Sequence, residues 1–206
     1  MSIVIVDYDV GNLRSVEKAL QTVRAEAFIS RDPEEIKSAD AMVLPGVGAF
    51  AECMGNLINL GLIDTVRKFI NSGKPFLGIC VGYQLLFEKS EEFGSANGLG
   101  VLKGECLRFN FKANTNRKIP HIGWNQVRLI KQGRLFKGIK DKTDFYFVHS
   151  YYPNPIENVI VTDTEYGVRF ASSIERDNVF ATQFHPEKSQ GAGLKVLENF
   201  SQISTG

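Results

Sequence analysis

The chain has 206 residues, of which 43% are hydrophobic and 23% are charged. This composition is typical of a folded globular protein and excludes a disordered chain. The length predicts one domain over residues 1–206, with two small domains as the alternative. Lys and Arg number 24 and Asp and Glu number 23, so the net charge is only +1. Without an overall positive field, we expect neither a nucleic-acid nor a membrane partner.

Three cysteines, Cys53, Cys80 and Cys106, are too few and too scattered for a disulfide framework, and no C-x-x-C pair indicates zinc. The first residues carry no cationic segment, and their apolar run ends at Asp7, which does not match a secretory signal. No stretch approaches the roughly 18 apolar residues of a membrane span. We therefore expect a cytoplasmic protein without a metal site.

The first half of the chain alternates between two hydrophobic patterns. Nearly continuous apolar runs at residues 3–6, 41–44 and 76–80 predict strands that are buried on both faces. Apolar residues at helical spacing over residues 13–23 and 63–70 predict helices between these strands. This alternation favours an α/β fold, in which right-handed crossovers place helices on both faces of a parallel sheet.

The second half is dominated by short β-like segments. They lie at residues 101–107, 125–130, 145–151, 167–174 and 179–183. A polar segment at 88–98 predicts a surface loop, and Leu194, Leu197 and Ile203 predict a closing helix. No Pro-, Ser- or Gly-rich linker separates the two halves, so we expect one central, mostly parallel sheet with an antiparallel extension.

Cys80 lies between two glycines in the segment Gly-Ile-Cys-Val-Gly, after a predicted strand and before a predicted helix. A G-x-nucleophile-x-G sequence in this context predicts a nucleophile elbow, a tight turn that strains the backbone of the nucleophile. The thiol would lie at a helix N-terminus, which favours the thiolate, and the N–H of Val81 would face an oxyanion. The alternative is a buried, unreactive cysteine. Cys53 and Cys106 lack this context, and we expect both to be structural.

His185, Pro186 and Glu187 follow the last predicted strand. A thiol nucleophile needs a base, and the base needs a group that orients it. Because proline fixes the backbone between His185 and Glu187, both side chains project from one rigid corner. Glu187 can then hold the imidazole tautomer that accepts a proton from Cys80. The alternative is a surface histidine beside a solvated glutamate.

Gly46 and Gly48 flank Val47 directly after the strand predicted at 41–44. Glycines here can turn main-chain N–H groups toward a tetrahedral intermediate on Cys80, which predicts an oxyanion strand. The alternative is a dinucleotide-binding fingerprint of the form G-x-G-x-x-A. That alternative is weaker, because the nearest plausible acidic residue, Asp64, lies inside a predicted helix instead of ending a second strand.

These motifs together resemble the triad-type, or class I, glutamine amidotransferases, and within them the glutaminase subunits of imidazole glycerol phosphate synthases of histidine biosynthesis. The resemblance rests on segments that occur in the same order, at residues 45–50, 78–84, 121–125, 147–151 and 184–189. It extends from Asp7 to the C-terminal helix. It implies a three-layer, flavodoxin-like α/β fold.

The resemblance also implies a mechanism without a cofactor. Cys80 attacks the side-chain amide of glutamine, His185 protonates the departing ammonia, Glu187 orients His185, and water hydrolyses the γ-glutamyl thioester. The implied oxyanion hole consists of Gly46, Val47, Gly48 and Val81. The implied contacts to glutamine are Gln84, Glu92, Ser150 and Tyr151. For Glu92, a solvated loop carboxylate stays open as an alternative, and His149 resembles a position near the active site.

A partner is implied as well. Glutaminase subunits of this kind form a heterodimer with a (β/α)8-barrel cyclase, which receives the ammonia. The residues implied to face this partner are Asn12, Trp124, Tyr146 and Lys188, although a packing role for Trp124 and a solvated Lys188 stay open. The resemblance further implies that the isolated chain has low glutaminase activity until the partner's ligand reorients the oxyanion strand.

Three other functions stay open at this point. A similar amidotransferase subunit could serve a synthase that amidinates a bacterial surface sugar, with the same triad and a different partner. A stand-alone thiol amidohydrolase would be fully active alone. A redox sensor would need Cys80 but neither His185 nor Glu187.

Overall fold

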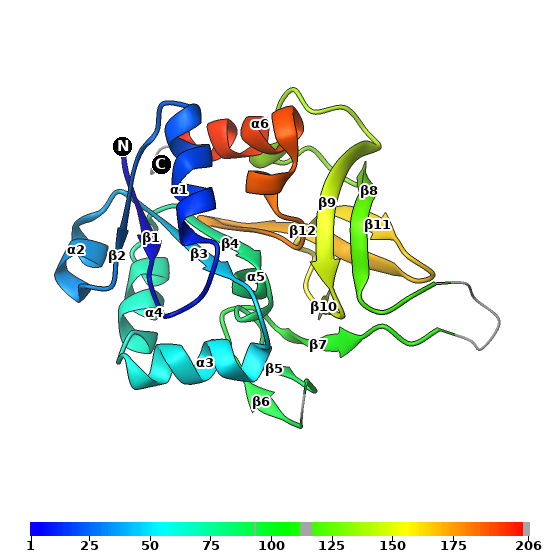
Figure 1. The fold of residues 1–206 in the computed structure, drawn as a ribbon, viewed down its shortest axis with the longest axis horizontal. Coiled ribbons are helices and arrows are strands. Elements are labelled where there is room, and N and C mark those ends of the chain that lie inside the picture. The colour runs from blue at the N-terminus through cyan, green and yellow to red at the C-terminus, as the bar shows by residue number, and fades with distance from the viewer. Residues whose placement is uncertain (93, 112–116, 204–206) are drawn as a thin grey trace.

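The computed structural model describes residues 1–92, 94–111 and 117–203. Figure 1 shows helices packed around a large sheet. Its strands, in chain order, are β1 (Ser2–Val6), β2 (Glu26–Ser30), β3 (Ala41–Gly46), β4 (Phe76–Cys80), β8 (His121–Leu129), β9 (Thr143–His149), β11 (Ile160–Glu165), β12 (Arg169–Arg176) and β13 (Val179–Thr182). Across the sheet they follow the order β2-β1-β3-β4-β13-β12-β11-β8-β9.

The strands β2, β1, β3, β4 and β13 pair in parallel. β1, β3 and β4 are apolar and almost entirely buried, because both faces of a parallel sheet are covered. These three strands are predicted from their continuous apolar runs, and the prediction is confirmed. The sequence pattern does not predict β2, because this edge strand is only partly buried and begins with an exposed glutamate.

The strands β12, β11, β8 and β9 continue the same sheet through antiparallel pairs. The predicted antiparallel extension of one α/β sheet is therefore confirmed. It contains the segments predicted at 125–130 and 167–174 and most of 145–151, with β11 between them, whereas the segment predicted at 179–183 forms β13, which pairs in parallel with β4.

A second, smaller sheet contains β5 (Lys89–Ser90), β6 (Ala96–Asn97), β7 (Gly104–Arg108) and β10 (Tyr151–Pro155), in the order β10-β7-β5-β6. The segment predicted at 101–107 lies here and not in the main sheet. The segment predicted at 145–151 is divided, because β9 ends at His149 and β10 begins at Tyr151. The predicted loop at 88–98 contributes β5 and β6, which at two residues each are too short to show a periodic pattern.

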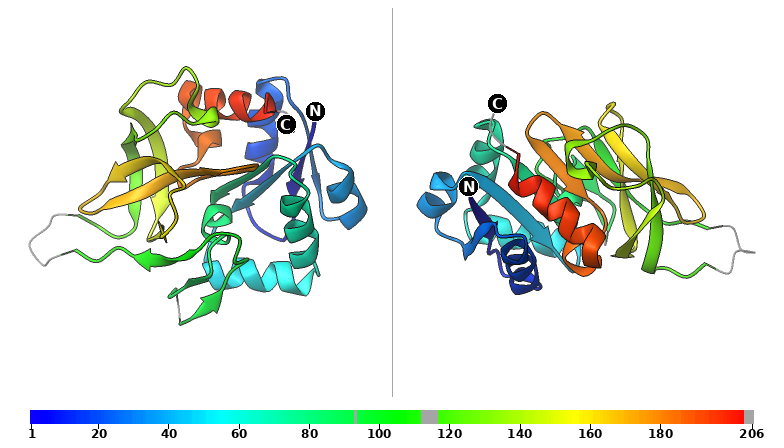
Figure 2. Two further views of the ribbon diagram at one scale, coloured as in Figure 1. Left: turned by 180° about the vertical axis from the view of Figure 1, so that it is seen from behind. Right: turned by 90° about the horizontal axis from the view of Figure 1, so that it is seen from above.

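Helices lie on both faces of the main sheet, as predicted. They are α1 (Leu13–Thr22), α2 (Pro33–Ser38), α3 (Phe50–Asn59), α4 (Ile63–Asn71), α5 (Val81–Gln84) and α6 (Gln190–Ser201), with short helical turns η1 (Arg134–Phe136) and η2 (Pro186–Lys188). Figures 1 and 2 show α1 and α6 side by side over one face and α3 and α4 on the other side. Within the described part of the chain, no helix combines the length and apolar character needed to cross a membrane.

The carboxyl ends of β1, β3, β4 and β13 meet at one edge of the sheet, because these strands run parallel. This is the edge at which open α/β sheets place their ligands. The segments that leave these strand ends carry Tyr8, Gly46, Cys80 and His185. The topology therefore brings three motifs together that are far apart in the sequence.

Candidate active site

Cys80 is the last residue of β4 and directly precedes α5. Its backbone has φ 54° and ψ −108°, and such a conformation costs on the order of 1–3 kcal/mol for a residue with a side chain. The flanking glycines are required by close approach. A Cβ on Gly82 would lie 1.8 Å from the carbonyl oxygen of Leu44, and a Cβ on Gly78 would lie 2.8 Å from that of Gly82. The predicted strained elbow is confirmed.

The thiol of Cys80 lines a cavity of about 270 Å³ that His185 also lines. Cys80 is only 3% exposed, so a substrate must enter this cavity to reach the sulfur. Gln183, directly after β13, approaches Cys80 as well, and its Nε2 lies 3.7 Å from Sγ. Sequence reasoning missed Gln183. Strand periodicity does not identify it, because β13 ends at Thr182 and both Gln183 and His185 follow the strand.

His185 and Glu187 form a buried pair. The Nδ1 atom of His185 lies 2.7 Å from Oε1 of Glu187, and the two side chains are 1% and 0% exposed. The Nε2 atom of His185 has no hydrogen-bond partner among the described residues. Burial lowers the pKa of His185, but the charge of Cys80 and the hydrogen bond that Nδ1 of His185 donates to Glu187 outweigh burial and raise this pKa to about 10. The imidazole is therefore held protonated when the nearby sulfur is ionised.

Asn12 provides a second hydrogen bond to the same carboxylate. Its Nδ2 donates to Oε1 of Glu187 at 2.5 Å. Asn12 is predicted from the family resemblance only as a residue facing the partner. Its contact with Glu187 is not predictable from local sequence, since 175 positions separate the two residues.

The corner that carries His185 is hydrogen-bonded to the backbone of β9. The backbone N–H of His185 donates to the carbonyl oxygen of Tyr146 at 2.9 Å. The hydroxyl of Ser189 donates to the carbonyl oxygen of His185 at 2.7 Å and accepts the N–H of Tyr146 at 3.0 Å. A Cβ on Gly193 would lie 1.9 Å from the carbonyl oxygen of Pro186, so α6 also packs tightly on this corner. The base is thus fixed by backbone contacts on two sides.

The segment predicted to form the oxyanion strand lies beside the elbow. Gly46 pairs with Cys80 across β3 and β4, and Val47, Gly48 and Val81 line the cavity. Gly46 itself is packed against the elbow, where a Cβ would lie 2.7 Å from the backbone nitrogen of Gly82. Among the described residues, the N–H groups of Val47 and Gly48 donate to no backbone carbonyl. These donors are therefore available to a ligand.

The other two cysteines lie away from this arrangement. Burial raises the pKa of Cys53 to about 12 and also raises that of Cys106, so neither is a reactive thiolate. Over residues 1–92, 94–111 and 117–203, no group of three or more His, Cys, Asp and Glu side chains could hold a metal ion. The cavity instead combines a thiol on a strained backbone, an imidazole whose pKa is raised, and free N–H donors, and these groups can carry out acyl transfer from an amide.

Comparison with known proteins agrees with this geometry. The model of the family glutamine amidotransferase class-I matches residues 4–203. This chain belongs to the class I glutamine amidotransferases. The resemblance drawn from the motifs and the predicted fold class are both confirmed.

Relatives of this amidotransferase cover nearly its whole length. Imidazole glycerol phosphate synthase subunit HisH of Aquifex aeolicus (strain VF5) is 53% identical over 204 residues, covering 98% of this chain and 97% of that protein. The protein of the same name from Methanocaldococcus jannaschii is 49% identical over 199 residues, covering 97% and 98%. The structure of PurLQS from Thermotoga maritima has a TM-score of 0.75 at 19% identity, covering 97% of this chain and 96% of that chain, which supports the fold alone.

The four residues predicted to contact glutamine all line the cavity of this amidotransferase; they are Gln84, Glu92, Ser150 and Tyr151. Nε2 of Gln84 donates to the carbonyl oxygen of Tyr151 at 2.9 Å and to Oε1 of Gln183 at 3.2 Å. Oε2 of Glu92 accepts the N–H of Phe50, the first residue of α3, at 2.6 Å. Glu92 therefore caps a helix that begins directly after the predicted oxyanion strand, and it is not a freely solvated loop carboxylate.

His149 also lines the cavity, and both of its ring nitrogens are engaged. Nδ1 lies 2.8 Å from the carbonyl oxygen of Tyr151, and Nε2 lies 3.0 Å from Nδ1 of His121. Burial lowers the pKa of His149 to about 3 and that of His121 to about 4. His121 and His149 are therefore neutral at physiological pH, and of these two only His149 lines the cavity.

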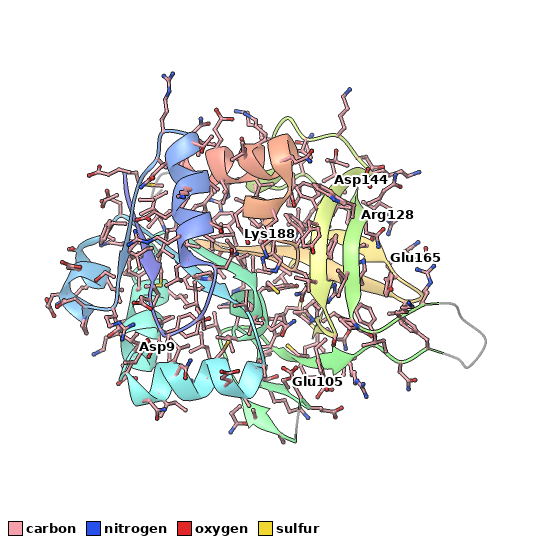
Figure 3. All side chains as sticks on the ribbon, viewed as in Figure 1. Asp9, Glu105, Arg128, Asp144, Glu165 and Lys188 are labelled. Carbon is pink, nitrogen blue, oxygen red and sulfur yellow. The ribbon has the colours of Figure 1, made fainter. Side chains whose placement is uncertain are left out.

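The residues predicted to face a partner surround the His185 corner. Trp124 is 49% exposed and packs edge-on against Tyr146, with 6.1 Å between ring centroids. Nζ of Lys188 lies 6.0 Å from the ring centroid of Tyr146, and Figure 3 shows Lys188 between the start of α6 and β9. Asn12 reaches the same corner through Glu187. The four residues thus border the candidate site instead of lying scattered over the surface.

Proposed function

We propose that this chain is the glutaminase subunit of imidazole glycerol phosphate synthase, which acts in histidine biosynthesis. It hydrolyses glutamine to glutamate and ammonia and passes the ammonia to a cyclase subunit. The observation that carries this proposal is one cavity that joins Cys80 to the His185–Glu187 pair. The relatives that are about 50% identical over nearly the whole chain support the pathway, since they carry the name of this subunit.

The reaction begins when Sγ of Cys80 attacks the carbonyl carbon of the glutamine side-chain amide. The resulting oxyanion accepts hydrogen bonds from the N–H of Val81 and from the strand at 46–48, which stabilises the tetrahedral intermediate. His185 gives its Nε2 proton to the amide nitrogen, ammonia leaves, and a γ-glutamyl thioester remains. His185 then takes a proton from water, which attacks the thioester and releases glutamate and the thiol.

Glu187 keeps His185 in the required orientation throughout. Its Oε1 accepts the Nδ1 proton of His185 at 2.7 Å, which leaves Nε2 to face the reacting atoms. Gln84, Glu92 and the backbone at Ser150 and Tyr151 bind the amino-acid end of glutamine. The carboxylate of Glu92 supplies the negative charge that a substrate ammonium requires.

The partner is a (β/α)8-barrel cyclase, bound as a heterodimer around the corner that carries Lys188. Trp124 supplies exposed aromatic surface there and packs on the half-buried Tyr146, and such residues are enriched among interface hot spots. Residues 1–206 act as a single amidotransferase domain, since strands from both halves of the chain build one site. The protein acts in the cytoplasm. The reaction as written uses no cofactor and no metal.

The test combines co-purification with an assay of glutamate release. Cys80→Ala should still bind the cyclase partner but lose glutaminase activity. Cys106→Ala, which removes another buried thiol, should keep both the partner and the glutaminase activity. The wild-type chain alone should be slow, and adding the cyclase with its nucleotide ligand should raise kcat about a hundredfold, the effect of one oxyanion donor.

Each alternative predicts a different result in the same experiment. Glutamate release by Cys80→Ala would disprove the nucleophile. Full activity of the isolated chain would favour a stand-alone amidohydrolase, and recovery of a sugar-modifying synthase would favour the surface-sugar pathway. Unchanged function of His185→Asn would favour a redox sensor.

A further inference from the structure

Two buried side chains that the proposed mechanism does not use hold the segment next to the cavity. Tyr8, which follows β1, is 0% exposed, and Cys53 in α3 is 1% exposed. The hydroxyl of Tyr8 donates to the carbonyl oxygen of Pro45. The thiol of Cys53 donates to the carbonyl oxygen of Val47 at 3.5 Å. Both bonds therefore end on the predicted oxyanion strand.

Each bond fixes the plane of one peptide group. Because the C=O and N–H of a trans peptide point in opposite directions, a tied carbonyl also sets the direction of the next N–H. Tyr8 thereby fixes the peptide that joins Pro45 to Gly46, and Cys53 fixes the peptide that joins Val47 to Gly48. The peptide between Gly46 and Val47 binds no side chain among the described residues. Only this central peptide can rotate without breaking either bond.

The two donors keep their protons at neutral pH. Burial raises the pKa of Tyr8 well above its usual value, and neighbouring Cys53 raises it further. Burial likewise raises the pKa of Cys53 to about 12. The strand packs closely between Tyr8 and α5 at this point, because a Cβ on Gly46 would lie 3.0 Å from the Tyr8 hydroxyl and 2.7 Å from the backbone nitrogen of Gly82.

We infer that Tyr8 and Cys53 are positioning residues for glutamine hydrolysis, which hold the oxyanion strand on both sides of the peptide between Gly46 and Val47. Reorientation is thereby confined to this one peptide, whose N–H turns toward the oxyanion. The inference rests on the proposed function, in which an oxyanion forms on the Cys80 intermediate. Because that charge exists only after attack, losing either bond should lower kcat and leave KM and the reactivity of the thiol unchanged.

The test compares matched pairs of variants in the complex with the cyclase and its nucleotide ligand. Tyr8→Phe is paired with Tyr83→Phe, since Tyr83 is equally buried and its hydroxyl has no partner in the described part of the chain. Cys53→Ala is paired with Cys106→Ala, whose thiol also donates to a backbone carbonyl, that of Gln84, at 3.6 Å. Steady-state kinetics with L-glutamine give kcat and KM. The rate at which iodoacetamide alkylates Cys80 reports the thiol, and the extent of labelling counts the folded sites.

Tyr8→Phe and Cys53→Ala should each lower kcat per folded site by about three- to tenfold, the effect of one neutral hydrogen bond. KM and the alkylation rate should stay within about twofold, as should all parameters of Tyr83→Phe and Cys106→Ala. A kcat of Tyr8→Phe equal to that of Tyr83→Phe would overturn the positioning role alone. A parallel fall in kcat and alkylation rate, or loss of folding in both variants, would make the residues merely structural and would also overturn it. A wild-type complex that released no glutamate would instead refute the proposed function.

Discussion

His121 and His149 are residues whose proton positions follow from their hydrogen bonds. A carbonyl oxygen only accepts, so Nδ1 of His149 must carry the proton that it shares with Tyr151, and Nε2 must accept from Nδ1 of His121. Nε2 of His121 then accepts from Nδ2 of Asn125 at 3.2 Å. The chain of bonds requires both rings to be neutral, in agreement with pKa values that burial lowers to about 3 and about 4.

This pair predicts a loss of stability in mild acid. Both pKa values lie below the usual histidine value of about 6.5. As the pH falls below 6.5, these two histidines therefore bind more protons in the unfolded chain than in the folded chain. The contribution of this pair to the free energy of unfolding should therefore be fully present above pH 6.5 and should decrease toward pH 4, by up to about 1.4 kcal/mol per pH unit for each histidine. Urea denaturation between about pH 4.5 and 5.5, where His185 is protonated in both the folded and the unfolded chain, measures this slope.

Single substitutions assign the slope to the pair. His121→Gln should reduce it by the contribution of one proton. His185→Asn should leave the slope below about pH 5.5 unchanged, because the pKa of His185 is raised to about 10 and His185 is protonated in both the folded and the unfolded chain there. Equal slopes in wild type and His121→Gln would contradict the assignment.

At the scale of elements, the site depends on how closely α5 approaches β3. Gly82 lies in α5, and a Cβ at this position would overlap the carbonyl group of Leu44. The approach allows the strand end at Gly46 to lie beside Cys80 in the parallel pair. The two glycines that flank Cys80 in the sequence motif are thus needed for the close packing of a helix on a strand.

Gly82→Ala should therefore destabilise the fold by roughly 3 kcal/mol or more, because the new Cβ meets backbone atoms that cannot move aside. The matched control is Gly55→Ala within α3, where a Cβ meets nothing within 4 Å. That change should stabilise the protein by about 0.5–1 kcal/mol, since alanine favours the helix. Thermal and urea unfolding of both variants provide the comparison, and similar effects of the two would disprove the packing argument.

For the whole molecule, the essential feature is that the segments just before α1 and just before α6, which are far apart in the sequence, meet at the site. Asn12 lies before α1 and Glu187 lies before α6, and the two helices pack side by side (Figure 1). Nδ2 of Asn12 donates a hydrogen bond to Oε1 of Glu187 at 2.5 Å, and this bond restrains the carboxylate next to His185. Docking of a partner on this corner would therefore act directly on the group that orients the base.

Asn12→Ala should lower kcat for glutamate release about tenfold to a hundredfold, because a hydrogen bond to a charged group contributes about 1.5–3 kcal/mol. The assay is run with saturating cyclase, and the loss should persist when the cyclase concentration is raised further. Asn56→Ala is the control, since among the described residues the Asn56 side chain makes one weak hydrogen bond, from Nδ2 to the carbonyl oxygen of Asp9 at 3.4 Å. A rate restored by more cyclase would show that Asn12 acts through partner binding and not through Glu187.

Much of this protein is predictable from short segments. The buried strands β1, β3 and β4, the elbow at Cys80 and the corner at His185 each lie within a few consecutive residues, where apolar runs, glycine and proline act locally. The family follows from the order of these segments, and the family match over residues 4–203 confirms it. The roles assigned to individual site residues stay predictions.

Contacts between distant residues could be recognised only in the folded chain. The bonds from Asn12 to Glu187, from Gln183 to Cys80 and from Tyr8 to Pro45 link elements that share no periodic pattern. The division of segment 145–151 between two sheets likewise depends on β7, which binds its second part. Hydrophobic periodicity reports which face of an element is buried, whereas the side chains that meet at a site depend on strand order and on how helices pack over it. For that reason the motifs identify the chemistry of this amidotransferase, and the fold supplies the contacts that orient it.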